Sequence, residues 1–196
     1  MNPDKLILTA FLLPICGAVA IVLARHWANL REAITLVTAT LLFACVIQLL
    51  DPVLAGERPY YLLLAPLRGL PIAFRVEPLG MLFALIASGL WIVNSVYSIG
   101  YMRGNKERNQ TRFYFFFALA IASALAIAFA ANLLTLFLFY EVLTLITYPL
   151  VTHAGTEKAK KGGRTYLGIL MGTSVLFLLP AVIYTWHAAG TTEFRP

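Results

Sequence analysis

Six apolar runs, each close to the length that crosses a membrane, restrict the fold of this sequence more than any other feature. A bilayer core of about 30 Å needs roughly 20 apolar residues in a helix. Runs of that size lie near residues 6–24, 33–50, 78–101, 113–130, 132–151 and 165–188. Only 12% of the residues are charged, against about a quarter in soluble domains. The sequence therefore predicts an all-α, polytopic bundle of about six transmembrane helices.

The fourth and fifth runs are separated by inference, because residues 113–151 are almost continuously apolar. A single helix of that length, at about 1.5 Å per residue, would be nearly twice as long as a span requires. We therefore expect the chain to reverse near Ala131 and Asn132. The longest loop, residues 51–77, alternates proline and glycine with short apolar stretches and fits a small β-hairpin or an irregular loop equally well. Since no repeat or linker divides the chain, we expect a single domain over residues 1–196.

The distribution of Lys and Arg predicts the orientation. Segments 25–32, 102–112 and 152–164 together carry ten of the fifteen basic residues. The alternate side carries Lys5, Arg58, Arg68, Arg75 and Arg195. The positive-inside rule then places the three segments in the cytoplasm and both termini outside, in a multi-pass protein of the cell's inner (plasma) membrane. No aromatic residues interleave with the basic ones as a stacking platform, so nucleic acid is not expected as a partner.

Small residues mark candidate contacts between helices. Transmembrane helices meet through such residues, because lipid gives apolar helices no hydrophobic reason to associate. The fourth run carries alanines at four-residue intervals, at positions 118, 122, 126 and 130, and the sixth carries Gly168 and Gly172 in a G-x-x-x-G frame. We expect both stripes to pack within the chain, with dimerisation as the less favoured alternative.

Glu141 is the candidate site for chemistry. It is the tenth of twenty residues in the fifth run, so its carboxyl group lies too deep to reach either membrane surface. A charged side chain at that depth costs about 2.5 to 3.5 kcal/mol on insertion scales, and such residues usually face a protein interior or a wet cavity. We expect Glu141 to exchange a proton. The alternative is a permanently protonated carboxyl group that bonds one helix to another.

Two residues extend the site along the same helix. Thr144 and Tyr148 lie three and seven positions after Glu141, on the same helical face. They predict a polar path toward Lys160 and Lys161. His26, His153 and His187 have no metal-ligand spacing, and their roles stay open. No metal or cofactor is expected, and the sequence contains no phosphate-binding loop, zinc-protease pair or nucleophile elbow, so a catalytic centre of its own is not expected.

Three segments resemble one family. The stretch FLFYEVLTLITYPLVTH, from Phe137 to His153, is similar to the fifth helix of the antiporter-like subunits of respiratory complex I, membrane-bound hydrogenases and Mrp-type sodium/proton antiporters. Two further segments support the likeness, FRVEPLG at residues 74–80 and YSIGYM at residues 97–102. The resemblance covers nearly the whole chain and is strongest to the D-type subunit of Mrp antiporters or the M-type subunit of complex I.

The resemblance implies a role for Glu141, but the lysine that would act with it is not in this sequence. In this family a glutamate on the fifth helix works with a lysine on the seventh, and Glu141 matches the glutamate. Members usually carry about fourteen helices that include two inverted repeats, whereas this sequence ends after six. We therefore expect either a fragment or a subunit that another chain completes.

Two hypotheses follow. The first is a proton- or cation-translocating subunit, or the N-terminal part of one, in an Mrp-type antiporter or an NADH-quinone oxidoreductase-like complex; it would work beside other membrane subunits, with protons or sodium as the ions. The second is a structural or assembly subunit of such a complex that has no ion path of its own. Transport by a variant in which Glu141 is replaced by Gln distinguishes the two hypotheses.

Overall fold

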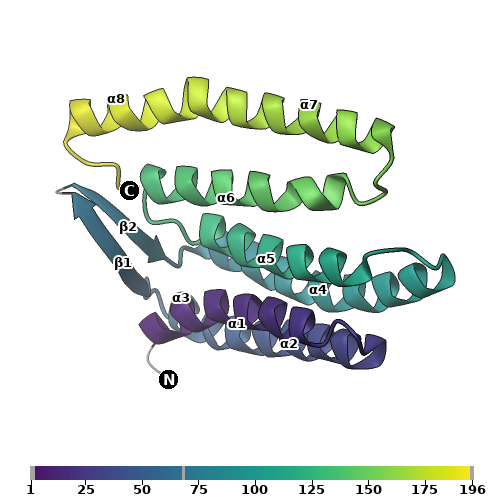
Figure 1. The fold of residues 1–196 in the computed structure, drawn as a ribbon. Helices are drawn as coiled ribbons and strands as arrows, with labels where there is room; N and C mark the ends of the chain where they lie inside the picture. The colour runs from purple at the N-terminus through teal and green to yellow at the C-terminus, as the bar shows by residue number, and fades with distance from the viewer. Residues whose placement is uncertain (1–2, 68, 195–196) are drawn as a thin grey trace.

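The computed structural model describes residues 3–67 and 69–194 and is mostly helical (Figure 1). Its elements are α1 (Pro3–Leu23), α2 (Ala28–Gln48), α3 (Leu50–Leu54), β1 (Tyr60–Leu67), β2 (Leu70–Arg75), α4 (Pro78–Gly104), α5 (Gln110–Ala128), α6 (Leu133–Val151), α7 (Glu157–Thr173), the π-helical turn η1 (Ser174–Leu178) and α8 (Leu179–Ala189). Six helical segments are long and apolar enough to cross a membrane, where α2 runs on into α3 and the sixth segment is Glu157–Ala189. The predicted number of spans is confirmed.

The sixth span begins earlier than expected. Its predicted start was residue 165, but α7 begins at Glu157 because the Thr156 hydroxyl accepts a hydrogen bond from the amide of Ala159 and caps the helix. Lys160 and Lys161 therefore lie on a helix and not in a loop. The second and fourth spans also begin earlier, at Ala28 and Gln110 instead of residues 33 and 113. In each case the apolar run marks the core of the helix, while the helix itself extends into polar residues.

The loop before α4 contains the β-hairpin that the sequence left as one of two options. β1 and β2 pair in antiparallel fashion, with Tyr60 opposite Arg75 and Leu62 opposite Ala73. The ladder is irregular between Leu62 and Leu67. The expectation of an all-α fold is thus corrected to a mostly helical one with a two-stranded sheet.

The helices stack in layers, with α7 and α8 outermost, α6 next, then α5 with α4, and finally α1 with α2 (Figure 1). α5 is central, since it packs on α1, α4 and α6. Its alanines 118, 122 and 126 are buried, as predicted for a packing face, whereas Ala130 lies beyond the end of the helix.

The second small-residue stripe behaves differently. A Cβ atom at Gly168 or Gly172 would meet nothing within 4 Å among the described residues. The prediction that this stripe packs within the chain is therefore wrong for the part of the chain that the structure describes. The physical reason is the position of α7, which turns Gly163 toward α6 and the other two glycines away from it.

The predicted reversal at Ala131 and Asn132 is confirmed and fixes where α6 begins. The Asn132 side chain is fully buried; its Oδ1 accepts from the Thr135 amide at 2.8 Å, and its Nδ2 donates to the Pro71 carbonyl at 2.9 Å. The Ala73 amide donates to Thr135 Oγ1 at 3.0 Å. Because these bonds join β2 to the first turn of α6, they set the height of every residue on α6.

The turns after α1, α4 and α6 gather at one end of the bundle, opposite the β-hairpin (Figure 1). Besides Arg112 and the basic residues of α7, two more that were assigned to loops lie inside helices, Arg31 in the first turn of α2 and Arg103 near the end of α4. Both stay at the end of the bundle where the sequence placed them. Arg68 and Arg195, which were counted on the other side, lie outside the described residues.

Candidate functional site

Glu141 lies at the middle of α6, as the ninth of its nineteen residues. The side chain as a whole is half-buried, but both carboxylate oxygens are shielded from solvent. Neither oxygen has a hydrogen-bond partner among the described residues. Glu141 is thus a carboxyl group held in an apolar helix layer without a neutralising contact from residues 3–67 or 69–194.

Contacts between α6 and α7 show which way Glu141 faces. A Cβ atom at the buried Gly163 of α7 would lie 3.1 Å from Tyr148 Cε2 and would also meet the Thr152 side chain. Tyr148 follows Glu141 by seven residues, close to two full turns, so the two side chains share a face. Glu141 therefore lies on the side of α6 that turns toward α7.

The opposite side of α6 borders an apolar groove of about 340 Å³ between α1, α5 and α6. Phe139, Val142 and Ile146 line it from α6. Since these residues are turned away from the face of Glu141, the groove and the carboxyl group are separate features. Helix α6 thus has two faces, one that carries Glu141 and one that lines the apolar groove.

Of the residues predicted to form a polar path, Thr144 and Tyr148 lie on α6 with Glu141, but the structure shows no direct contact among these three side chains. Thr144 is buried, and its hydroxyl donates to the Tyr140 carbonyl at 3.0 Å, within its own helix. Tyr148 is half-buried against Gly163 and lies about 10 Å from Glu141 along the helix axis. Protons would need water to pass between these groups.

The two predicted lysines lie at the beginning of α7, far from the level of Glu141. Lys160 is exposed, and its ammonium group pairs with Glu157 at 2.8 Å. Lys161 is also exposed. Neither contacts Glu141, so they serve as surface charges at the end of the α6–α7 pair. A hydroxyl contact between Thr147 and Tyr166, at 3.1 Å, joins the same two helices nearer the centre.

A second polar cluster, which the sequence did not reveal, joins α2, α4 and α5 at the end where the turns gather. Arg31 and Glu32 are both buried, and Arg103 donates to both carboxylate oxygens of Glu32. Arg31 also donates to Gln110 at 2.8 Å, and its guanidinium lies over the Tyr114 ring at 5.4 Å. Adjacent Arg and Glu at a helix start are unremarkable in a sequence, so only the packing of three helices identifies them.

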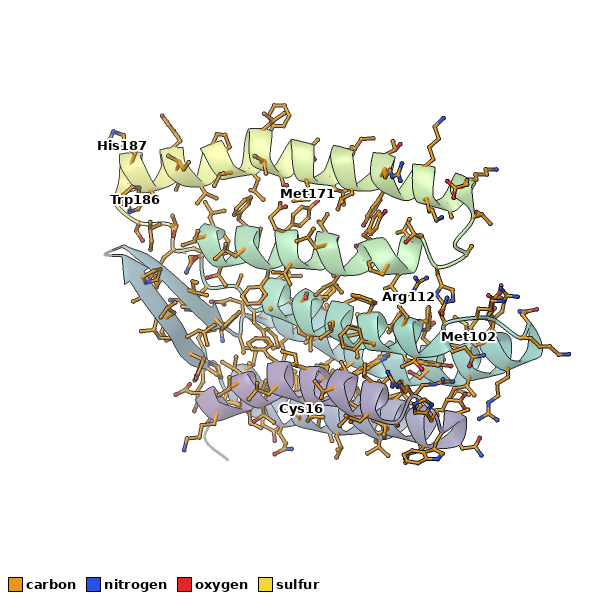
Figure 2. The ribbon with its side chains drawn as sticks, viewed as in Figure 1. Cys16, Met102, Arg112, Met171, Trp186 and His187 are labelled. Atoms are coloured by element: carbon orange, nitrogen blue, oxygen red, sulfur yellow. The ribbon has the colours of Figure 1, made fainter. Side chains whose placement is uncertain are left out.

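His153 is a further group that sequence reasoning left without a role. It lies two residues after α6 ends, and both ring nitrogens are buried without a hydrogen-bond partner among the described residues. Burial lowers the pKa of His153, and the nearby charge of Arg112 lowers it further, while Glu107 acts weakly in the opposite direction. Figure 2 shows Arg112 at the start of α5, beneath the turn that follows α6.

The remaining histidines differ from His153. His26 is exposed and accepts a hydrogen bond from Arg25 at 3.0 Å, and His187 is exposed at the outer end of α8 (Figure 2). Within the described ranges, no three His, Cys, Asp or Glu side chains lie close enough together to hold a metal ion.

Two family models match the chain. Residues 68–114 match the N-terminus of chain 5 of NADH-ubiquinone oxidoreductase (complex I). Residues 130–196 match the transmembrane region of NADH:quinone oxidoreductase and Mrp antiporters. The second match contains all of α6 and α7, and with them Glu141 and the turn that carries His153. A search among curated proteins found no match.

Solved structures share the fold. A chain of the membrane-bound sulfane sulfur reductase, an archaeal respiratory membrane complex, is similar with a TM-score of 0.78 and 19% identity over 94% of this chain and 28% of its own. A chain of the Mrp complex from a Dietzia species gives a TM-score of 0.69 and 21% identity over 98% of this chain and 20% of its own. This chain therefore spans less than a third of the length of either.

Proposed function

Because this chain belongs to the family of antiporter-like membrane subunits of complex I and Mrp antiporters, we propose that it takes part in ion translocation, with Glu141 as its proton-exchanging carboxyl group. It is a multi-pass membrane protein, and six helical segments of its described residues are long and apolar enough to cross a membrane. The proposed role of Glu141 rests on the burial of both its carboxylate oxygens without a hydrogen-bond partner among the described residues.

The unpaired state of the carboxylate oxygens carries the proposal. An ionised carboxylate that is buried without a hydrogen bond or a cation is strongly destabilised. We propose that the approach of water or a cation on this face of α6 lets Glu141 release a proton, and that their withdrawal favours uptake of one. A group whose charge depends on its neighbours in this way binds and releases a proton as those neighbours move.

We propose that a cation from beyond the described residues completes the site. Within residues 3–67 and 69–194, every ion pair joins groups other than Glu141. The family resemblance implies a lysine as the partner. We propose that the rest of a longer polypeptide, or a neighbouring subunit of a multisubunit complex, supplies it on the face of α6 where Glu141 lies.

The path is proposed to run from Glu141 past Thr144 and Tyr148 to the end of the bundle that carries Lys160 and Lys161. The Thr144 hydroxyl donates to the Tyr140 carbonyl within its own helix, and we propose that water joins it to Tyr148. We place that end in the cytoplasm and both termini outside the plasma membrane, because the basic residues concentrate there. Protons are the ions that this carboxyl group handles, and sodium is a second candidate for the complex as a whole.

The test is the Glu141→Gln variant in the complete complex that contains this chain. Gln keeps the size and hydrogen-bonding capacity of the side chain but cannot carry a proton between solutions. Transport driven by a pH gradient, measured in inverted membrane vesicles, should fall about tenfold or more if the carboxyl group exchanges protons in each cycle. Glu157→Gln serves as the matched control, because Glu157 is an exposed carboxylate at the start of α7 and should leave transport unchanged.

The second hypothesis, a structural or assembly subunit without an ion path, makes the opposite forecast. If Glu141→Gln assembles normally and transports at the wild-type rate, the translocation role is wrong. Assembly is checked by the yield of the intact complex on a sizing column.

A further inference from the structure

His153 is a half-buried titratable group whose ring nitrogens are shielded and lack a hydrogen-bond partner among the described residues, and the proposal above does not use it. Its ring lies in the turn between α6 and α7, with both nitrogens shielded and unpaired among the described residues. The Nε atom of Arg112, its neighbour on α5, is also buried and unpaired. Two strongly polar side chains thus lie side by side at one end of the bundle, and the described protein groups leave three of their nitrogen atoms unsatisfied.

Unpaired nitrogens of this kind call for water. A neutral imidazole has one N–H donor and one lone-pair acceptor, and buried polar atoms are normally satisfied by protein or by ordered water. The Phe113 ring meets the imidazole edge-on, with centroids 5.7 Å apart, and offers no hydrogen-bond acceptor of its own. Water that enters this site would bond both ring nitrogens and would connect them to solvent at that end of the bundle.

The charges around the ring favour rapid release of a proton. Arg112 faces His153 from α5 and donates from Nη2 to the His153 carbonyl at 3.2 Å, so a fixed cation stays close to the ring. Glu107, from the turn between α4 and α5, is the acidic group that acts on the ring. Since burial and Arg112 together lower the pKa of His153, the neutral form of the ring is favoured near pH 7.

We propose that His153 is a proton relay at the mouth of the path that leads to Glu141. One ring nitrogen accepts a proton from a hydronium ion in the aqueous phase and forms an N–H bond. The N–H bond at the other nitrogen then breaks and passes its proton to a water molecule on the side of Tyr148. The imidazole ends in its other neutral tautomer, and a ring flip restores the starting arrangement with one proton moved.

This relay rests on the proposed function of Glu141, and the distance between the two residues limits how they can act together. His153 follows Glu141 by twelve residues, or about 18 Å along the helix, so the two groups do not exchange a proton directly. Thr152 does not bridge the gap, because its hydroxyl donates back to the Tyr148 carbonyl at 2.9 Å. We propose that water links His153 to Tyr148, the next polar side chain toward Glu141. His153 therefore controls entry, while Glu141 controls passage through the middle.

The first test compares His153→Gln with His187→Gln in the complete complex. Gln fills the site and hydrogen-bonds to water but does not titrate, and His187 is an exposed histidine on the same chain. His153→Gln should slow pH-gradient-driven transport about tenfold, and added imidazole, tens of millimolar, should restore part of the rate. His187→Gln should match the wild type. A rate for His153→Gln equal to wild type, or a loss that imidazole does not restore, overturns the relay.

The second test uses Arg112 and remains informative if His153→Gln fails to assemble. Arg112→Gln removes the neighbouring cation and should raise the pKa of His153, so the acidic limb of the pH–rate profile should move to higher pH. Arg112→Lys keeps the charge and should leave the profile in place. Identical profiles for both variants overturn the relay.

The two proposals fail separately. Wild-type transport by Glu141→Gln removes the proposed function. Blocked transport by Glu141→Gln together with an unchanged rate and profile for His153→Gln removes only the relay.

Discussion

At the scale of single residues, two buried carboxyl groups in this chain have opposite surroundings. Glu32 is buried and accepts hydrogen bonds from Arg103 and Arg31, which compensate its negative charge. Glu141 has buried oxygens and no such partner among the described residues. Removal of one partner from a buried ion pair leaves the other charge uncompensated, whereas a buried carboxyl group without a partner has no such contact to lose. The two glutamates thus differ in whether the described residues supply a counter-charge.

This contrast predicts different effects of the same substitution on stability. Glu32→Gln leaves Arg31 and Arg103 without their counter-charge and should lower the free energy of unfolding by about 2 to 3 kcal/mol, since Arg103 is half-exposed and partly screened. Glu141→Gln should leave it unchanged or raise it, because it removes an uncompensated carboxyl group. Thermal unfolding of the purified complex in detergent measures both. An equal loss of stability in the two variants would contradict the assignment.

At the scale of the elements, close backbone contacts fix the height of the helices. Gly80 in the first turn of α4 packs directly on the Ala128 carbonyl at the end of α5. Asn132 then joins the next helix to β2. Because these contacts hold the ends of α4, α5 and α6 against the hairpin, the mid-helix position of Glu141 follows from them.

The Gly80 contact predicts a strong positional dependence of Gly→Ala substitutions. A Cβ atom at Gly80 would clash with the Ala128 carbonyl oxygen, which is backbone and cannot swing away. Gly80→Ala should therefore destabilise the chain by about 1 to 3 kcal/mol, as overpacking usually does. Gly168→Ala is the matched control in a helix of the same kind, and it should be neutral or slightly stabilising, because a Cβ there meets nothing within 4 Å. Similar melting temperatures for the two variants would refute the close approach.

At the scale of the whole molecule, the fold sorts its charges between two ends. The turns after α1, α4 and α6 share one end with the Arg31–Glu32–Arg103 cluster, Arg112 and His153, while the hairpin occupies the other (Figure 1). A proton path through Glu141 would thus connect a basic end to a hairpin end. Which end faces the cytoplasm decides the direction in which the proposed relay works.

The positive-inside rule predicts that the basic end is cytoplasmic. In a background without Cys16 and Cys45, a cysteine at the exposed Asn105 should react with a membrane-impermeant maleimide only in inverted vesicles. A cysteine at the exposed Ala55, in the loop before the hairpin, should react only in intact cells or right-side-out vesicles. The reverse pattern would invert the proposed orientation.

The sequence by itself determined the number of spans, the reversal near Asn132 and the depth of Glu141. These features depend on the length of apolar runs against the thickness of a bilayer, which is a local property of the chain. The sequence allowed either a β-hairpin or an irregular loop at residues 51–77, because short apolar stretches and turn residues are compatible with both. The apolar runs predicted the starts of α2, α5 and α7 too late in the chain, because helix caps and polar first turns are not part of an apolar run.

Only the tertiary structure decided which faces meet. It turned Gly163 toward α6 and left Gly168 and Gly172 without a partner, although all three look alike in sequence. It also brought Arg103 to Glu32 across 71 positions and buried the ring nitrogens of His153 beside Arg112. Such contacts depend on the rotation and height of neighbouring helices, and those are set by close backbone approaches such as the one at Gly80 and not by the composition of any single run.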